Sequence, residues 1–407
     1  MSVIPFISAE KIAGLSTATF SSLKTTSIAA LATTQAAVLH ADQINALTST
    51  ALQYMAMTQI QSISSTAMSG LLAAQIQAFT DTQIGELAAT QVSALTGDEI
   101  GALSTTELQN LSTTQANALT ADQIGSLSTA VINNLTTTQV AALAATQVQG
   151  LTTTQLNALS NDHLGALDVT KLATGQAAGL STTVIGDLTT AQVAALAATQ
   201  VAALTASQIE QLTTAELQNL STTQVNAITM SQIGTLSTTV LNNLTTTQVA
   251  ALTTTQVQGL YWSQLNALSL TNLDALDVTR LLPVQVLGLN TTTIINLTEA
   301  QVGALSAAEI SVLTVAGVNS LTTTEIAALT TTQAGGFTSV QIAGMTTTNF
   351  SALSSTSGIP GLSTSAIPGL TTDQINSLTT TQGNAFLETQ ISAMSIDVAS
   401  ALAALIQ

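Results

Sequence analysis

The feature that most constrains this chain is an eight-residue repeat that runs through almost its whole length. From Ile7 to Leu402 a large apolar residue recurs every eight positions, which gives 47 octads, two five-residue units (pentads) and one nine-residue unit. The octad consensus, with positions 1 to 8, is Leu-(Ser/Thr)-x-x-(Gln/Glu)-(Val/Ile/Leu)-x-x. Fixed internal periods are typical of solenoid proteins, in which each repeat buries its apolar face only against neighbouring repeats.

The spacing within the octad predicts that every repeat begins its own helix. Ser or Thr at position 2 and Gln or Glu at position 5 match the capping box, and the apolar residues at positions 1 and 6 match the hydrophobic staple. The octad Leu135-Thr-Thr-Thr-Gln139-Val140-Ala-Ala fits both patterns. Glycine at positions 7 and 8, as at Gly150 and Gly259, is interpreted as the end of the helix.

These helices must be short. In one continuous helix a period of eight would rotate the apolar stripe by roughly 80° per octad, so no face would stay apolar. We therefore expect helices of five to seven residues in an all-α solenoid, with positions 1 and 6 buried and positions 3 and 4 exposed. A Thr-rich β-solenoid is the alternative, because Thr favours strands. However, positions 1 and 6 are an odd number of residues apart, which would put them on opposite faces of a strand.

A longer period of 109 residues lies above the octad. Residues 103–211 match residues 212–320, and a partial third copy covers residues 321–402. Each full copy contains a pentad at the same phase, at residues 167–171 and 276–280. We expect the pentad to reset the coil after thirteen octads, about once per superhelical turn.

The predicted organisation is a leader at residues 1–6, a continuous solenoid at 7–402 and a tail at 403–407. The leader lacks the charged and long apolar regions of a cleavable signal peptide. Hydroxyl residues interrupt every apolar run before it reaches the 18 or so residues of a spanning helix, so no membrane insertion is predicted.

Composition narrows the possible partners and chemistry. A net charge of −17, from 21 acidic and four basic residues, opposes binding to nucleic acid and to anionic lipid. There is no cysteine, so disulfide and thiolate chemistry are excluded. The two histidines, His40 and His163, are far apart and are expected to face solvent. We find no catalytic triad pattern, paired carboxylates or phosphate-binding loop, and predict no enzyme activity, cofactor or metal.

Tyr261 and Trp262 are candidate contact residues. They replace Thr152 and Thr153 of the preceding 109-residue copy, at positions that should face outward. Exposed aromatic side chains are typical of interaction surfaces. The alternative is that the two rings fold over a neighbouring octad.

Four further residues are candidate contacts. Lys171 and Arg280 close the two pentads and are expected to be ion-pair or helix-dipole partners, with an intersubunit contact as the alternative. Leu402 and Leu405 lie at the last octad, where we expect copies of the chain to join end to end, because no polar capping segment is visible.

The Leu-Thr-x-x-Gln octad, over nearly the whole chain, resembles the octapeptide arrays of large bacterial surface proteins. With the absence of cysteine and the scarcity of lysine, the resemblance implies an extracellular or cell-surface location. We therefore predict a structural, self-assembling filament or surface-coat subunit of bacterial origin, with itself and other surface components as partners. The alternative is a binding module whose Thr rows at positions 2 to 4 bind ice, glycan or mineral.

Overall fold

The computed structural model describes residues 4–407, and within this range all regular elements are helices and no strand is present. The 47 α-helices and four 3-10 helices run from η1 (Ile4–Phe6) to α47 (Ile396–Ile406). All the α-helices before α47 are four to six residues long, slightly shorter than predicted, and α47 has eleven residues. The all-α solenoid prediction is confirmed, and the β-solenoid alternative is not supported.

The helix starts follow the capping chemistry, as α17 (Thr137–Ala142) illustrates. Thr136 is the N-cap in extended conformation, and its hydroxyl accepts from the N–H of Gln139 at 3.1 Å. The Gln139 side chain accepts in turn from the N–H of Thr136 at 2.7 Å. Octads with alanine at position 2 keep only the second bond, as when Gln147 accepts from Ala144 at 2.9 Å.

The core consists of positions 1 and 6, as predicted. In the octad that begins at Leu135, this leucine and Val140 are buried, whereas Thr137 and Thr138 are exposed. The leucine at position 1 leaves the helical conformation, as at Leu143, where φ is −54° and ψ is 132°. One break in each octad therefore turns all the apolar residues toward the same axis.

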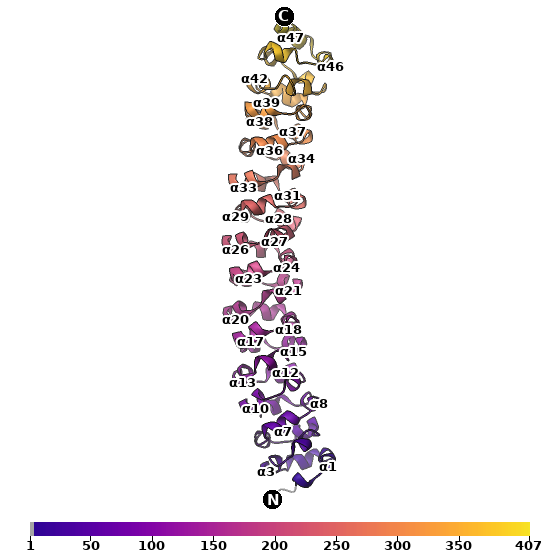
Figure 1. The fold of residues 1–407 in the computed structure, drawn as a ribbon, viewed down its shortest axis with the longest axis vertical. Coiled ribbons are helices and arrows are strands. Elements are labelled where there is room, and N and C mark those ends of the chain that lie inside the picture. The colour runs from indigo at the N-terminus through magenta and orange to yellow at the C-terminus, as the bar shows by residue number, and fades with distance from the viewer. Residues whose placement is uncertain (1–3) are drawn as a thin grey trace. The chain divides into compact units, whose positions relative to one another are not determined.

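The described chain divides into two compact units, Met1–Leu204 and Thr205–Gln407. Within each unit, helices three repeats apart pack together on successive turns of a coil (Figure 1). In the first unit α15 (Ala121–Ser126) packs on α18 (Ala145–Gly150). In the second unit α28 (Met230–Thr235) packs on α31 (Thr254–Gly259).

Buried glutamines at position 5 join these turns. The Nε2 group of Gln139 donates to the carbonyl oxygens of Leu108 and Leu111, both at 2.8 Å. These acceptors lie four and three octads earlier, so one turn of the coil takes between three and four octads. In the second unit Gln256 makes the same pair of bonds.

We call this set of residues the glutamine ladder, and each member donates to two or three backbone carbonyls of the preceding turn. In the first unit the members are Gln35, Gln43, Gln59, Gln83, Gln91, Gln115, Gln123, Gln139, Gln147, Gln155, Gln176, Gln192 and Gln200. In the second unit they include Gln248, Gln256, Gln264, Gln285, Gln301, Gln333, Gln341, Gln374, Gln382 and Gln390.

The pentads do not reset the coil, so that prediction is wrong. The first pentad forms η2 (Val169–Lys171), a single 3-10 turn. After it, Gln176 donates to Val148 and Leu151, 28 and 25 residues earlier, where the usual separations are 31 and 28. Both separations fall by the three residues that the pentad lacks. A pentad therefore occupies one full place in the coil, and a turn needs far fewer than thirteen octads.

The glycines do not end helices by adopting a left-handed conformation, because no residue between 4 and 407 has a positive φ. Gly150 instead allows a close approach of helices. A Cβ atom at this position would lie 2.6 Å from the carbonyl oxygen of Ala121, on α15. At Gly165 the same atom would meet nothing within 4 Å. The prediction that glycine lies at the end of the helix is confirmed, since α18 ends at Gly150 and α31 (Thr254–Gly259) ends at Gly259. At Gly150 the reason is the close packing of helices and not a left-handed cap.

The two predicted end segments are partly helical. Ile4 is buried, and its carbonyl oxygen accepts from Gln35 at 2.8 Å, so this residue of the predicted leader takes part in the ladder. Residues 1–3 lie outside the described range. The predicted tail at 403–407 continues α47 as far as Ile406. Among the described residues no helix combines the length and apolar character needed to cross a membrane.

Candidate functional site

Tyr261 and Trp262 lie on the surface at the start of α32 (Trp262–Leu265), with 61% and 56% of their area exposed. The ladder fixes the backbone beneath them. Gln264 accepts from the N–H of Tyr261 at 2.7 Å and donates to Ile233 and Leu236 of the preceding turn. Because the ladder sets the backbone, Tyr261 and Trp262 occupy the same places at a helix start as the threonines of other octads, and both side chains are exposed.

The two rings line a shallow surface hollow in the second unit, which we call the aromatic hollow. Its other side chains come from α28, from α31 and from α34 (Pro283–Leu287). The residues used below are Met230, Ser231, Gln258, Tyr261, Trp262 and Val284.

Glycines bring the elements of the aromatic hollow close together. A Cβ atom at Gly259 would lie 2.8 Å from Cγ of Met230, and one at Gly288 would lie 2.5 Å from Cβ and Cγ of Trp262. Trp262 thus lies directly against the end of α34 while more than half of its surface stays open. Both alternatives stated for Trp262 therefore hold in part, because it covers a neighbouring repeat and still faces solvent.

The sequence prediction missed Met230 and Val284, both of which are exposed in the aromatic hollow. The signal was present in the 109-residue repeat, since their counterparts in the first copy are Ala121 and Gly175.

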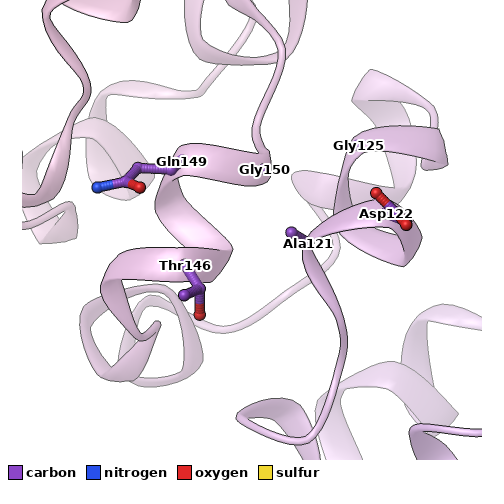
Figure 2. A pocket seen from close by; sticks show the side chains of 6 residues that line it. All are labelled: Ala121, Asp122, Gly125, Thr146, Gln149 and Gly150. Carbon is purple, nitrogen blue, oxygen red and sulfur yellow. The ribbon is translucent and has the colours of Figure 1, made fainter.

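The equivalent hollow of the first copy is lined by small and polar residues (Figure 2). They are Ala121, Asp122, Gly125, Thr146, Gln149 and Gly150. Figure 2 shows Gly150, at the end of α18, facing Ala121, with the side chains of Asp122 and Gln149 on opposite sides of the hollow. None of these lining residues is aromatic.

Lys171 and Arg280 form ion pairs within their pentads, as predicted. The Nζ atom of Lys171 lies 3.4 Å from Oδ2 of Asp168, and Nε of Arg280 lies 2.9 Å from Oδ2 of Asp277. The side chains of Lys171 and Arg280 also replace a ladder glutamine, because each donates to a backbone carbonyl of the preceding turn. Lys171 donates to the carbonyl oxygen of Leu143 at 2.7 Å, and Arg280 makes the matching bond in the second pentad. An intersubunit contact by either residue stays a prediction.

The two pentad aspartates are held in the charged form. The hydroxyl of Thr170 donates to Asp168 at 2.6 Å and, together with the nearby Lys171 charge, lowers the pKa of this carboxyl group. Thr279 and Arg280 lower the pKa of Asp277 in the same way.

His163 is half-buried, so the expectation that it faces solvent is wrong. Its Nε2 atom lies 2.6 Å from the carbonyl oxygen of Leu135, which can only accept, so Nε2 carries the proton. His163 thus replaces a ladder glutamine, as Asn272 does in the next copy. His40 is exposed, as predicted.

Glu99 and Gln75 are the two described residues of the first unit that each have a buried side-chain oxygen without a hydrogen-bond partner. Glu99 is buried at a ladder position, where one oxygen accepts from the N–H of Thr96 at 2.5 Å. The other oxygen has no hydrogen-bond partner among the described residues. Loss of solvent on burial raises the pKa of this carboxyl group above its ordinary value, although the bonds from Thr96 oppose the shift.

The last two candidate contact residues lie on α47. Leu402 is buried within its own unit and Leu405 is half-buried, and both approach the place where Gly383 would carry a side chain. Leu402 is therefore not free to form a contact with a second copy. The exposed large apolar residues of this helix are Ile396 and Ile406.

Between residues 4 and 407 no group of three or more His, Cys, Asp or Glu side chains is placed to hold a metal ion.

The comparisons with known proteins support the repeat architecture. No curated protein matches the chain. A family model described as the ALTTAQ repeat matches residues 92–129. Together with the succession of short helices, this similarity makes the chain a repeat protein with a helical solenoid fold.

Proposed function

We propose that the chain is a structural, self-assembling protein without catalytic activity, a filament or surface-coat subunit outside a bacterial cell. One observation carries the proposal: the two faces of each turn are complementary. One face presents ladder donors such as Gln139, and the other presents position 1 and 6 carbonyl oxygens such as those of Leu108 and Leu111. A turn from another copy offers the same groups, and head-to-tail contacts of this kind extend into filaments.

The use of polar groups within the fold supports a structural role. In a typical octad the hydroxyl at position 2 caps the helix, and the amide at position 5 bonds both the cap and the preceding turn. The side chains best placed for specific chemistry are thus engaged within the backbone framework. What remains on the surface is mainly Thr, Ser and Ala at positions 3, 4 and 7.

The turn formed by α46 (Glu388–Ile391) and α47 is our candidate for the self-contact. Ile391 occupies position 6, which is buried in interior octads, yet 40% of its area is exposed. Ile396 is 85% exposed on the same turn. Covering apolar area stabilises association by about 25 cal/mol per Å². We propose a second copy of the chain as the covering surface and other surface components as further partners.

An extracellular, bacterial setting is supported by composition and resemblance. The chain has no cysteine and only four basic residues, and its octads resemble those of bacterial surface arrays. A net charge of −17 makes copies repel one another, so self-association should strengthen as salt screens the charge. The same charge is the reason to propose neither nucleic acid nor anionic membranes as partners.

The proposal is tested by sedimentation velocity and electron microscopy of the purified chain, from about 20 mM to about 1 M salt. We expect large species that increase with salt and filaments on the grid. I396K should reduce assembly, whereas V340K, which adds the same charge at a residue that is 70% exposed on α41 (Ser339–Gly344), should not. A wild-type chain that stays monomeric at every salt concentration would rule out the filament.

A further inference from the structure

The two 109-residue copies provide an internal control for surface function, because they share a backbone pattern and differ in side chains. Among the described residues of the first copy, 103–211, no large apolar side chain is exposed. The second copy, 212–320, exposes eight: Met230, Tyr261, Trp262, Leu270, Leu282, Val284, Leu287 and Ile295. Between these two copies, the exposed large apolar side chains all belong to the second, so they do not follow from the repeat itself.

The aromatic hollow contains half of these eight residues. From the first copy to the second, the changes are Ala121 to Met230, Thr152 to Tyr261, Thr153 to Trp262 and Gly175 to Val284. In addition, the carboxylate of Asp122 is replaced by the hydroxyl of Ser231. The hollow has therefore gained apolar and aromatic surface and lost its charge.

Folding does not require these changes, because the ladder beneath is the same in both copies. In the first copy Gln155 donates to the preceding turn at 2.8 and 2.7 Å, and in the second Gln264 donates at 2.9 and 2.8 Å. The threonine pair and the aromatic pair thus lie on equivalent helix starts. The aromatic residues expose apolar area to water without improving the internal bonds, which points to contact with a ligand.

One polar group has also become free in the second copy. In the first copy Gln149 donates to the carbonyl oxygen of Lys171 at 3.4 Å. The side-chain amide of its counterpart, Gln258, has no hydrogen-bond partner among the described residues. The aromatic hollow therefore combines two open rings, an unengaged amide and the exposed hydroxyl of Ser231, and no charged side chain lines it.

We propose that the aromatic hollow binds an uncharged glycan. Sugar rings have C–H faces that pack on aromatic rings such as those of Tyr261 and Trp262, and hydroxyl groups at their edges that bond to amides and hydroxyls. The Gln258 amide and the Ser231 hydroxyl supply these polar partners. This binding activity is additional to self-assembly and would attach the assembled protein to a polysaccharide.

Charge and size favour a glycan over other occupants. Phosphate-rich or acidic partners are opposed by the net charge of −17 and by the absence of a basic residue in the hollow. A stable protein–protein interface commonly buries about 800 Å² of surface on each partner, from about 20 to 30 residues. The aromatic hollow instead offers a short apolar surface interrupted by polar groups, which suits one or two sugar rings.

The experiment uses the single tryptophan of the chain, Trp262, as a probe inside the hollow. The full chain is titrated with neutral hexasaccharides of β-linked glucose, β-linked N-acetylglucosamine and α-linked glucose, with tryptophan fluorescence as the readout. Calorimetry and pull-down on the matching insoluble polysaccharides give a second measurement. We expect at least one of the sugars to bind and to change the fluorescence.

Two variants locate the site. The double substitution Y261T and W262T restores the residues of the first copy, so the fold is retained and glycan binding should weaken by at least about tenfold in calorimetry. L270N also restores a first-copy residue, Asn161, but outside the hollow, and should leave binding unchanged. Absence of binding to all three sugars, or equal binding by the double variant, would overturn the proposal. So would loss of self-association in the double variant without any glycan binding, which would assign the hollow to a second copy.

Discussion

Replacing Gln139 by glutamate tests the central structural claim, that the glutamine ladder holds successive turns together. The substitution hardly changes the shape of the side chain. It preserves the oxygen that accepts from the N–H of Thr136 at 2.7 Å. It removes the two donors that bond Leu108 and Leu111 at 2.8 Å, and it places a buried carboxylate beside their carbonyl oxygens.

The expected loss is large for a change of one functional group. Two amide–carbonyl bonds contribute about 0.5–1.5 kcal/mol each, and leaving buried groups without partners adds about 1–3 kcal/mol. We therefore expect Q139E to lower the local stability of this turn by about 2–6 kcal/mol. The chain should still fold, because glutamate occurs naturally at position 5, for example at Glu107.

Hydrogen exchange read by mass spectrometry is the appropriate assay, because repeat proteins can open locally and the exchange of each peptide reports the stability of its own turn. Peptides covering residues 103–143 should exchange faster in Q139E, while peptides several turns away should not. Q149E adds the same charge at an exposed glutamine of the neighbouring octad and is the control. Equal protection in Q139E and Q149E would refute the role of the ladder.

Three further substitutions test the buried carboxylate, the helix contacts and the core. E99Q supplies the donor that the carboxylate lacks. It should raise the free energy of unfolding at pH 7, measured by urea titration, by about 1–3 kcal/mol. Burial raises the pKa of Glu99 in the folded state, so the contribution of this residue to the free energy of unfolding declines as pH rises from about 4.5 through the folded pKa. In urea titrations at several pH values, E99Q should not show this pH dependence. G150A should destabilise the first unit by about 1–3 kcal/mol in circular dichroism melts, because its Cβ would overlap Ala121, whereas G165A, which has open space, should be neutral or stabilising by up to about 1 kcal/mol. L143A should cost about 2–5 kcal/mol in urea unfolding, and a cost near zero would contradict the assignment of position 1 to the core.

The local part of the fold could be predicted because its causes lie within one octad. The bonds between Thr136 and Gln139 join residues three apart, so the spacing of Ser or Thr and Gln indicates a helix start directly. The other end of the same side chain could not be assigned. Its acceptors, Leu108 and Leu111, lie 31 and 28 residues away, and only the number of octads per turn brings them into reach.

The glycines show why a correct local rule can give the wrong reason. A glycine near the end of a short helix fits a left-handed cap, and the sequence alone does not distinguish this from a close approach of another helix. Gly150 and Gly165 occupy similar places near the ends of their helices, yet only Gly150 faces a neighbouring backbone. The difference depends on the packing between turns, which an octad does not encode.

The candidate site was partly predictable for a related reason. Tyr261 and Trp262 break the threonine pattern of their own octad, so they could be identified one at a time. Met230 and Val284 are single exposed apolar residues in octads that are separated in the sequence from the octad of Tyr261 and Trp262. They become part of the aromatic hollow only because the coil brings α28, α32 and α34 together on successive turns.

The residues that replace glutamine in the ladder indicate what this position requires. Five chemically different side chains each make a hydrogen bond to the position 1 carbonyl oxygen 28 residues earlier: His163, Lys171, Asn272, Arg280 and Ser357. They share neither charge, size nor flexibility, and only the ability to donate is common to all. Where a donor occupies this position its chemical type is therefore free, so a pentad that ends in a cation can take the place of an octad. A donor is not obligatory, because the buried Glu107 and Val184 also occupy position 5. Since the glutamine ladder and the apolar positions fix the turn, positions 3 and 4 can change at little cost and position 2 with the loss of one capping bond. The second copy could therefore acquire its aromatic hollow on an unchanged backbone.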